Sequence, residues 1–127
     1  MLRNKRVLAS AAALAPLLLV ACAPKQAPVT YTKDIRPILE KNCVSCHVPG
    51  GEGYEKSGLS MATYDTLMKG TKFGPVIVPG NSASSTLLLL LEGKADPSIT
   101  MPHGTSERLP EADIALFRDW IDQGAKQ

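Results

Sequence analysis

The spacing of apolar side chains along this chain of 127 residues predicts a mostly helical protein with long loops. Two segments at opposite ends of the sequence have the clearest apolar faces, residues 34–42 and residues 110–124. These faces are formed by Ile35, Ile38 and Leu39 in the first segment and by Ile114, Phe117, Trp120 and Ile121 in the second. One-sided apolar faces of this kind are typical of helices that cover a core.

Shorter helices are predicted at residues 63–69 and 84–92, where Gly70 and Gly93 provide the stops. The segments between the predicted helices are rich in Pro and Gly and are predicted to form loops, at residues 49–53, 73–80 and 96–106. A small helical domain with long loops buries little apolar surface of its own. A bound cofactor would supply much of the missing apolar contact.

The candidate chemistry lies directly after the first predicted helix, where Cys43, Cys46 and His47 form a C-x-x-C-H motif. This motif is typical of covalent attachment of a c-type haem. The two thiols lie about one helical turn apart and can reach the two vinyl groups on one porphyrin edge, and the histidine can then bind the iron. A thioredoxin-like C-x-x-C needs a βαβ context that the flanking sequence lacks. A structural zinc site needs four Cys or His ligands and would use every candidate, His103 included.

A second axial ligand for such an iron is expected from residues 99–104, a loop rich in Pro and Gly. Met101 is the first candidate, because Pro102 stiffens the backbone beside it and a thioether ligand raises the reduction potential of haem. His103 is the rival ligand, and an open or water-filled position is the third possibility.

The N-terminus has the pattern of a secretory signal. Basic residues come first, and residues 7–20 are apolar but interrupted by Pro16, so the stretch is too short and broken for a transmembrane helix. The next residues, Ala21 and Cys22, end a sequence that resembles the bacterial lipobox. We therefore expect residues 1–21 to be a lipoprotein signal peptide and Cys22 to be acylated. The alternative is an ordinary signal cleaved near Ala21 or Ala23, with Cys22 incidental.

Removal of this leader changes the charge of the chain. Three of the 14 basic side chains are lost with residues 1–21, which leaves 11 against 12 acidic ones. A nucleic-acid partner would need a clustered basic face, and the sequence suggests none. Residues 22–30 are predicted to be the lipidated cysteine and a Pro- and Ala-rich tether, and residues 31–127 a single domain. No cysteine is left for a disulfide, because two belong to the motif and Cys22 to the lipid.

The domain resembles a class I cytochrome c, and in detail the small planctomycete-type cytochrome c domain. The matching segments are residues 31–39 before the C-x-x-C-H, 58–61, 78–82, 85–87, the Met101-Pro102 pair and residues 120–125. The resemblance implies an all-α cytochrome c fold in which the N- and C-terminal helices cross and long loops surround one covalent haem c. His103 departs from the family pattern, which usually has Pro or another non-ligand there. Tyr31 and Tyr64 are candidates for hydrogen bonds to the haem.

The function expected from these features is that of a monohaem one-electron carrier, held in the cell envelope by its lipid. It would lie on the periplasmic side or at the outer membrane, exchange electrons with partner proteins and act on no small-molecule substrate. The sequence shows no acid–base constellation of an enzyme. The alternative is a haem-based gas or redox sensor, or a small peroxidase, which would need a labile sixth position.

Overall fold

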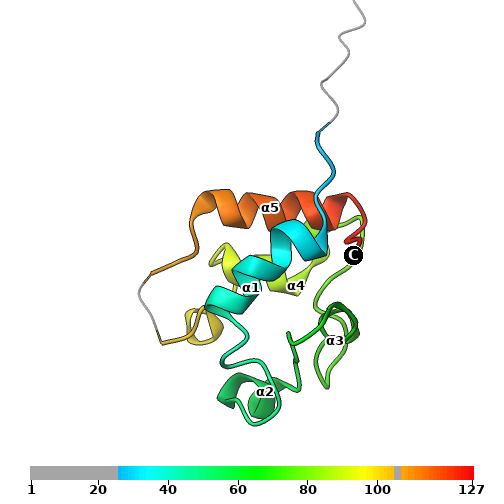
Figure 1. The fold of residues 1–127 in the computed structure, drawn as a ribbon. Coiled ribbons are helices and arrows are strands. Elements are labelled where there is room, and N and C mark those ends of the chain that lie inside the picture. The colour runs from blue at the N-terminus through cyan, green and yellow to red at the C-terminus, as the bar shows by residue number, and fades with distance from the viewer. Residues whose placement is uncertain (1–25, 105–106) are drawn as a thin grey trace, which may run out of the picture.

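The computed structural model describes residues 26–104 and 107–127, and within them the chain is all-α, as the sequence predicts (Figure 1). An isolated bridge between Thr71 and Gly74 is the β-type pairing found in the described residues. The elements in chain order are the π-helical turn η1 (Tyr31–Ile35), α1 (Arg36–Asn42), α2 (Glu52–Ser57), α3 (Tyr64–Lys69), the 3₁₀ turn η2 (Ser82–Ser84), α4 (Thr86–Leu91), the 3₁₀ turn η3 (Pro97–Ile99) and α5 (Glu111–Asp122).

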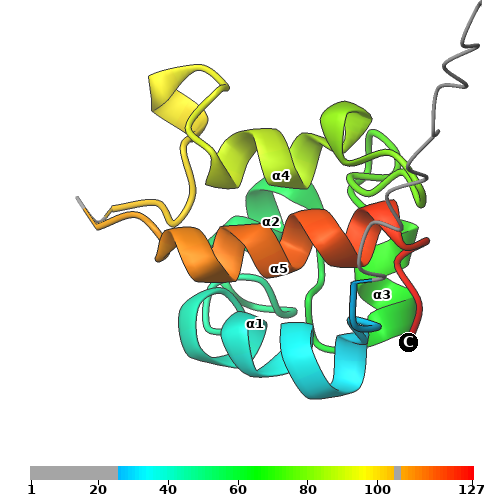
Figure 2. The same cartoon turned by 90° about the horizontal axis from the view of Figure 1, so that it is seen from above.

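The first and last helical segments cross each other, with α5 lying over η1 and α1 (Figures 1 and 2). The apolar stripes predicted from the sequence face inward here, since Ile35, Leu39, Phe117 and Trp120 are fully buried. The backbone N–H of Tyr31 donates to the carbonyl of Lys126 at 3.1 Å, which fixes the start of the domain to its end. The expected crossing of the two ends is therefore confirmed.

Helix α4 lies on the other side of α5 and is tied to it at both ends (Figure 2). Ser82, just before α4, donates its backbone N–H and its hydroxyl to the carboxylate of Asp122 at 2.8 and 2.9 Å. At the far end of α4, Glu92 accepts a hydrogen bond from Arg118 of α5 at 2.6 Å. These contacts fix α4 as a rigid wall beside the two terminal helices.

Several predicted boundaries differ from the structure. The helix predicted at residues 34–42 is divided into η1 and α1, and the predicted loop at residues 96–106 contains η3. The loop predicted at residues 49–53 ends early, because α2 begins at Glu52, where an ion pair with Lys56 one turn later supports the helix. The helix predicted at residues 84–92 is divided into η2 and α4. The division lies at Ser85, whose hydroxyl donates to the carbonyl of Asn81 and accepts from the backbone N–H of Val78.

The helix predicted at residues 63–69 is present as α3. Thr63 caps it in a reciprocal capping box with Thr66, and Gly70 ends it with a positive φ of 83°, which glycine adopts without strain. None of the helices in residues 26–104 and 107–127 is long and apolar enough to cross a membrane. The predicted signal peptide and Cys22 lie outside the described residues.

Candidate functional site

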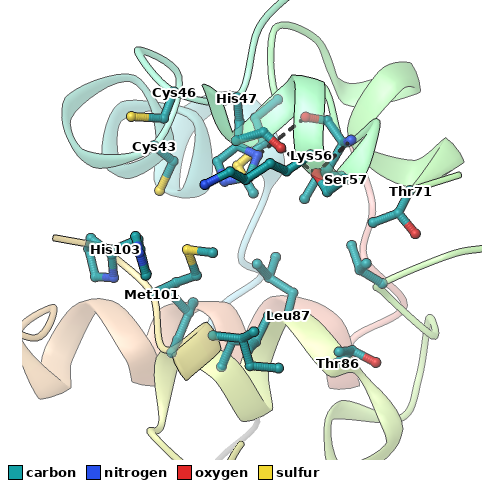
Figure 3. A pocket seen from close by; sticks show the side chains of 18 of the residues that line it. Cys43, Cys46, His47, Lys56, Ser57, Thr71, Thr86, Leu87, Met101 and His103 are labelled. Atoms are coloured by element: carbon teal, nitrogen blue, oxygen red, sulfur yellow. Dashed lines mark hydrogen bonds between the residues drawn. The ribbon is translucent and has the colours of Figure 1, made fainter. Parts of the chain in front are cut away.

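The C-x-x-C-H motif forms a tight turn at the end of α1. The backbone N–H groups of Cys46 and His47 both donate to the carbonyl of Cys43, at 3.1 and 3.0 Å. The two cysteines are free thiols, with Cys43 half-buried and Cys46 exposed. Both thiols lie at the same end of a cavity into which His47 points from the same wall (Figure 3). The turn thus brings two thiols and an imidazole to one edge of a common space.

The imidazole of His47 is held in one orientation. It is 7 % exposed, and its Nδ1 lies 3.3 Å from the carbonyl oxygen of Leu59. A carbonyl can only accept, so Nδ1 carries the proton and Nε2 is left with its lone pair for a metal ion. Metal-binding histidines are commonly oriented by this kind of backbone contact. Leu59 lies in residues 58–61, one of the segments that resemble the cytochrome c family. The sequence did not predict that its carbonyl orients His47.

The cavity has a volume of about 640 Å³, which is within the range of sites for small organic cofactors. Its lining is mainly apolar and comes from residues between Asn42 and His103. The apolar lining residues include Leu59, Met61, Val76, Leu87, Leu90 and Leu91. At the end of the cavity away from the two thiols lie Thr71 and Thr86 (Figure 3). A flat, largely apolar group that reaches from the thiols to this polar end fits the space.

Met101 and His103 both line the cavity from the wall opposite His47 (Figure 3). Met101 is half-buried and is in contact with the core, whereas His103 is exposed. Both candidates for a second iron ligand therefore lie on the cavity wall opposite His47, as a second ligand requires. The greater burial of Met101 favours it over His103, because a ligand must face the interior.

Two ionisable groups of the cavity have shifted pKa values. Burial raises the pKa of the Cys43 thiol to about 11, with a smaller contribution from Cys46. The pKa of Glu52 is lowered, first by its hydrogen bond from Lys56. Cys43 is therefore a neutral thiol near pH 7 in this environment, and the Glu52–Lys56 ion pair is at the exposed rim.

Tyr31 and Tyr64 were candidates for hydrogen bonds to a haem, but neither lies at the cavity. Tyr31 is buried against Trp120, and the hydroxyl of Tyr64 donates to the carbonyl of Ala125 at 2.8 Å. Both tyrosines therefore hold the termini together, and the expectation that they contact a haem is wrong for this arrangement.

The ligand set does not fit structural zinc. In the parts of the chain that the structure describes, no three His, Cys, Asp or Glu side chains come together as metal ligands. A haem fits this site better than a bare metal ion, because a porphyrin supplies the equatorial ligands of its iron itself. The site offers the porphyrin two thiols along one edge, one oriented imidazole and an apolar cavity.

Comparison with known families supports this interpretation. Residues 43–104 match the family model of planctomycete cytochrome C. The resemblance drawn from the sequence motifs is thereby confirmed, and the helical arrangement is consistent with a cytochrome c-like fold. The matched segment begins at the first cysteine of the motif and ends just after His103, so this cytochrome c segment contains both walls of the cavity. A domain of this family suggests a haem-based electron carrier. No curated protein and no solved structure matches the chain.

Proposed function

We propose that this protein is a monohaem c-type cytochrome that transfers single electrons and is anchored in the cell envelope by lipid on Cys22. The observation that carries the proposal is the orientation of His47. Its Nδ1 faces the Leu59 carbonyl, and its ring enters a largely apolar cavity of about 640 Å³ beside two thiols. The residues that would hold the haem are Cys43 and Cys46 through thioether bonds and His47 through Nε2.

The chemistry that haem supplies here is a one-electron change at its iron. The Leu59 carbonyl holds the His47 ring in one orientation, so the ring would stay in place when the charge on a bound iron changes. The apolar residues Leu87 and Leu91 keep water away from the centre of the cavity. Met101 on the opposite wall would complete the coordination, and a thioether ligand favours the reduced state.

If Met101 binds the iron together with His47, no position would be left for a substrate or a gas, and this ligand pair supports an electron carrier over a peroxidase or a gas sensor. Redox partner proteins would then exchange electrons with the domain at the exposed side of the cavity, where Cys46 lies.

The lipid anchor rests on the sequence around Cys22 and on the tether that follows it. Residues 26–30, the described end of this tether, have no regular secondary structure and lead directly into η1. The backbone of Val29 and Ala27 is hydrogen-bonded to the side chain of Gln123 at 2.9 and 3.2 Å, so this end of the predicted tether is held on the domain. The cell envelope is the compartment that such an anchor implies.

The test of the proposed function is an optical redox titration of the purified haem protein, with carbon monoxide added to the reduced form. We expect a single transition that follows a one-electron Nernst curve, and no spectral change with carbon monoxide. Rapid binding of carbon monoxide to the wild-type protein would assign it to the sensor or peroxidase class instead.

A further inference from the structure

The position of Gly53 in α2 is unusual, because this residue is inside a helix and has no left-handed conformation that would require glycine. Alanine is the better helix former at such a place, since glycine loses more backbone entropy on folding. A reason for glycine must therefore come from outside the helix.

The neighbour that explains it is His47. A Cβ atom added to Gly53 would lie 2.8 Å from Cε1 and 2.9 Å from Nε2 of the imidazole. Real Cβ atoms do not approach other atoms this closely. The same Cβ would also lie 3.1 Å from the carbonyl oxygen of Cys46. Gly53 thus lies directly against the edge of the ring that contains the candidate iron ligand.

Neither side of this contact is free to move away. The backbone N–H of Tyr54, the next residue of α2, donates to the carbonyl of Cys46 at 3.0 Å and fixes the helix to the haem-binding motif. The ring of His47 is buried and its Nδ1 is held by Leu59. Any side chain at position 53 would therefore displace the imidazole rather than the helix.

We propose that Gly53 is a positioning residue: its missing side chain leaves the space in which the His47 ring presents Nε2 to the haem iron. This inference rests on the proposed haem site and adds to it the residue that determines the ring's position. A methyl group at position 53 would tilt the ring or lengthen its bond to iron, while α2 itself would keep its helical conformation.

The experiment compares Gly53→Ala with the wild-type haem protein by electron paramagnetic resonance of the ferric form and by redox titration. The g values of low-spin ferric haem depend on the orientation and strength of the axial ligands. We expect shifted g values and a changed reduction potential in Gly53→Ala, with the α-helical circular dichroism unchanged.

The matched controls are Glu55→Ala and Glu55→Gly, at an exposed position of the same helix that does not line the cavity. They raise and lower the helix propensity of α2 without approaching His47. Both should retain the wild-type g values and potential. If Glu55→Gly shifts them as Gly53→Ala does, or if Gly53→Ala shifts nothing, the proposal is wrong.

A second measurement needs no variant and applies even if Gly53→Ala does not accumulate. In the reduced wild-type haem protein, a nuclear Overhauser effect should connect an Hα of Gly53 with Hε1 of His47. Its absence in a haem protein with assigned resonances would overturn the positioning role. Absence of haem from the purified wild-type protein would instead overturn the proposed function, so the two failures are distinguishable.

Discussion

Tyr31 and Trp120 share one hydrogen-bond acceptor, the carbonyl oxygen of Lys126. The backbone N–H of Tyr31 reaches it at 3.1 Å and the indole N–H of Trp120 at 2.6 Å. The two rings also contact each other, with centroids 6.2 Å apart. The beginning of the domain, its last helix and its C-terminal residues therefore meet at one point, on which the stability of the crossed helices depends.

Trp120→Ala should remove the centre of this contact. The side chain is fully buried, so its loss leaves a large cavity, and we expect a decrease of about 3–5 kcal/mol in the free energy of unfolding. Denaturant unfolding of the haem protein measures this decrease. Val78→Ala is the control, because the Val78 side chain is 41 % exposed and its loss should cost less than about 0.5 kcal/mol. Equal effects of the two substitutions would contradict the account of the core.

The ion pair between Glu92 and Arg118 predicts a dependence of stability on pH. The pKa of Glu92 is lowered, first by its hydrogen bond with Lys94 and then by that with Arg118. The carboxyl side chain is 11 % exposed. A lowered pKa in the folded state stabilises the fold above the unfolded value of about 4.3, and this stabilisation is lost as the pH falls through the folded pKa.

Glu92→Gln should therefore decrease the free energy of unfolding at pH 7 by about 1 kcal/mol, and the difference from wild type should shrink below about pH 4. Denaturant unfolding at several pH values measures both effects. Glu111→Gln is the control, since Glu111 lies 3.7 Å from the same arginine but is 78 % exposed. A loss for Glu92→Gln that is constant down to pH 3 would show that the charge is not its cause.

Met101→Leu should open the iron, because leucine keeps the apolar volume but cannot coordinate. The reduced variant is expected to bind carbon monoxide, and its reduction potential should fall, since the thioether no longer stabilises the ferrous state. Met61→Leu is the matched control, for Met61 is a buried methionine of the same cavity. It should retain the wild-type spectrum.

His103→Ala tests whether His103, rather than Met101, is the second iron ligand. The exposed His103 side chain should be replaceable with no change in visible spectrum or potential. If His103→Ala opens the iron to carbon monoxide and Met101→Leu does not, the axial pair is His47 and His103, and the carrier would work at a lower potential.

Cys22→Ser should release the protein from the membrane fraction without loss of haem, because the lipid is predicted on Cys22 and the proposed haem ligands lie in the domain. More than one acyl chain is needed for durable anchoring, at roughly 0.8 kcal/mol per buried methylene. Fractionation of cells with detection of covalent haem measures the distribution. A wild-type protein that is wholly soluble, with an unmodified N-terminus, would contradict the anchor.

The parts of the fold that could be predicted from the sequence are those with strong local signals. The apolar stripes of α1 and α5 and the Thr63–Gly70 boundaries of α3 were sufficient for their helices. Helix α2 was missed, because the glycines at positions 50, 51 and 53 suggest a loop and part of the helix's support comes from contacts with the C-x-x-C-H turn. Local propensity does not register such tertiary contacts.

The residue types of the candidate site could be predicted from the sequence, but the backbone contacts around His47 could not. The spacing of Cys43, Cys46 and His47 predicts covalent haem attachment directly, and the residues Pro97, Pro102 and Gly104 around Met101 predict a ligand loop. The Leu59 carbonyl is a backbone group that any residue type can provide, so the sequence does not single it out. Gly53 is marked by its residue type, but its contact with the His47 ring follows from how α2 packs on the C-x-x-C-H turn and emerges only in three dimensions.

The central claim is that Cys43 and Cys46 hold one haem covalently beside His47, and intact-mass measurement of the purified protein tests it most directly. After denaturation and extraction with acidic acetone, the polypeptide should retain the added mass of one haem. Cys43→Ala/Cys46→Ala should lose that mass. A wild-type polypeptide that has its unmodified mass after this extraction would contradict the account.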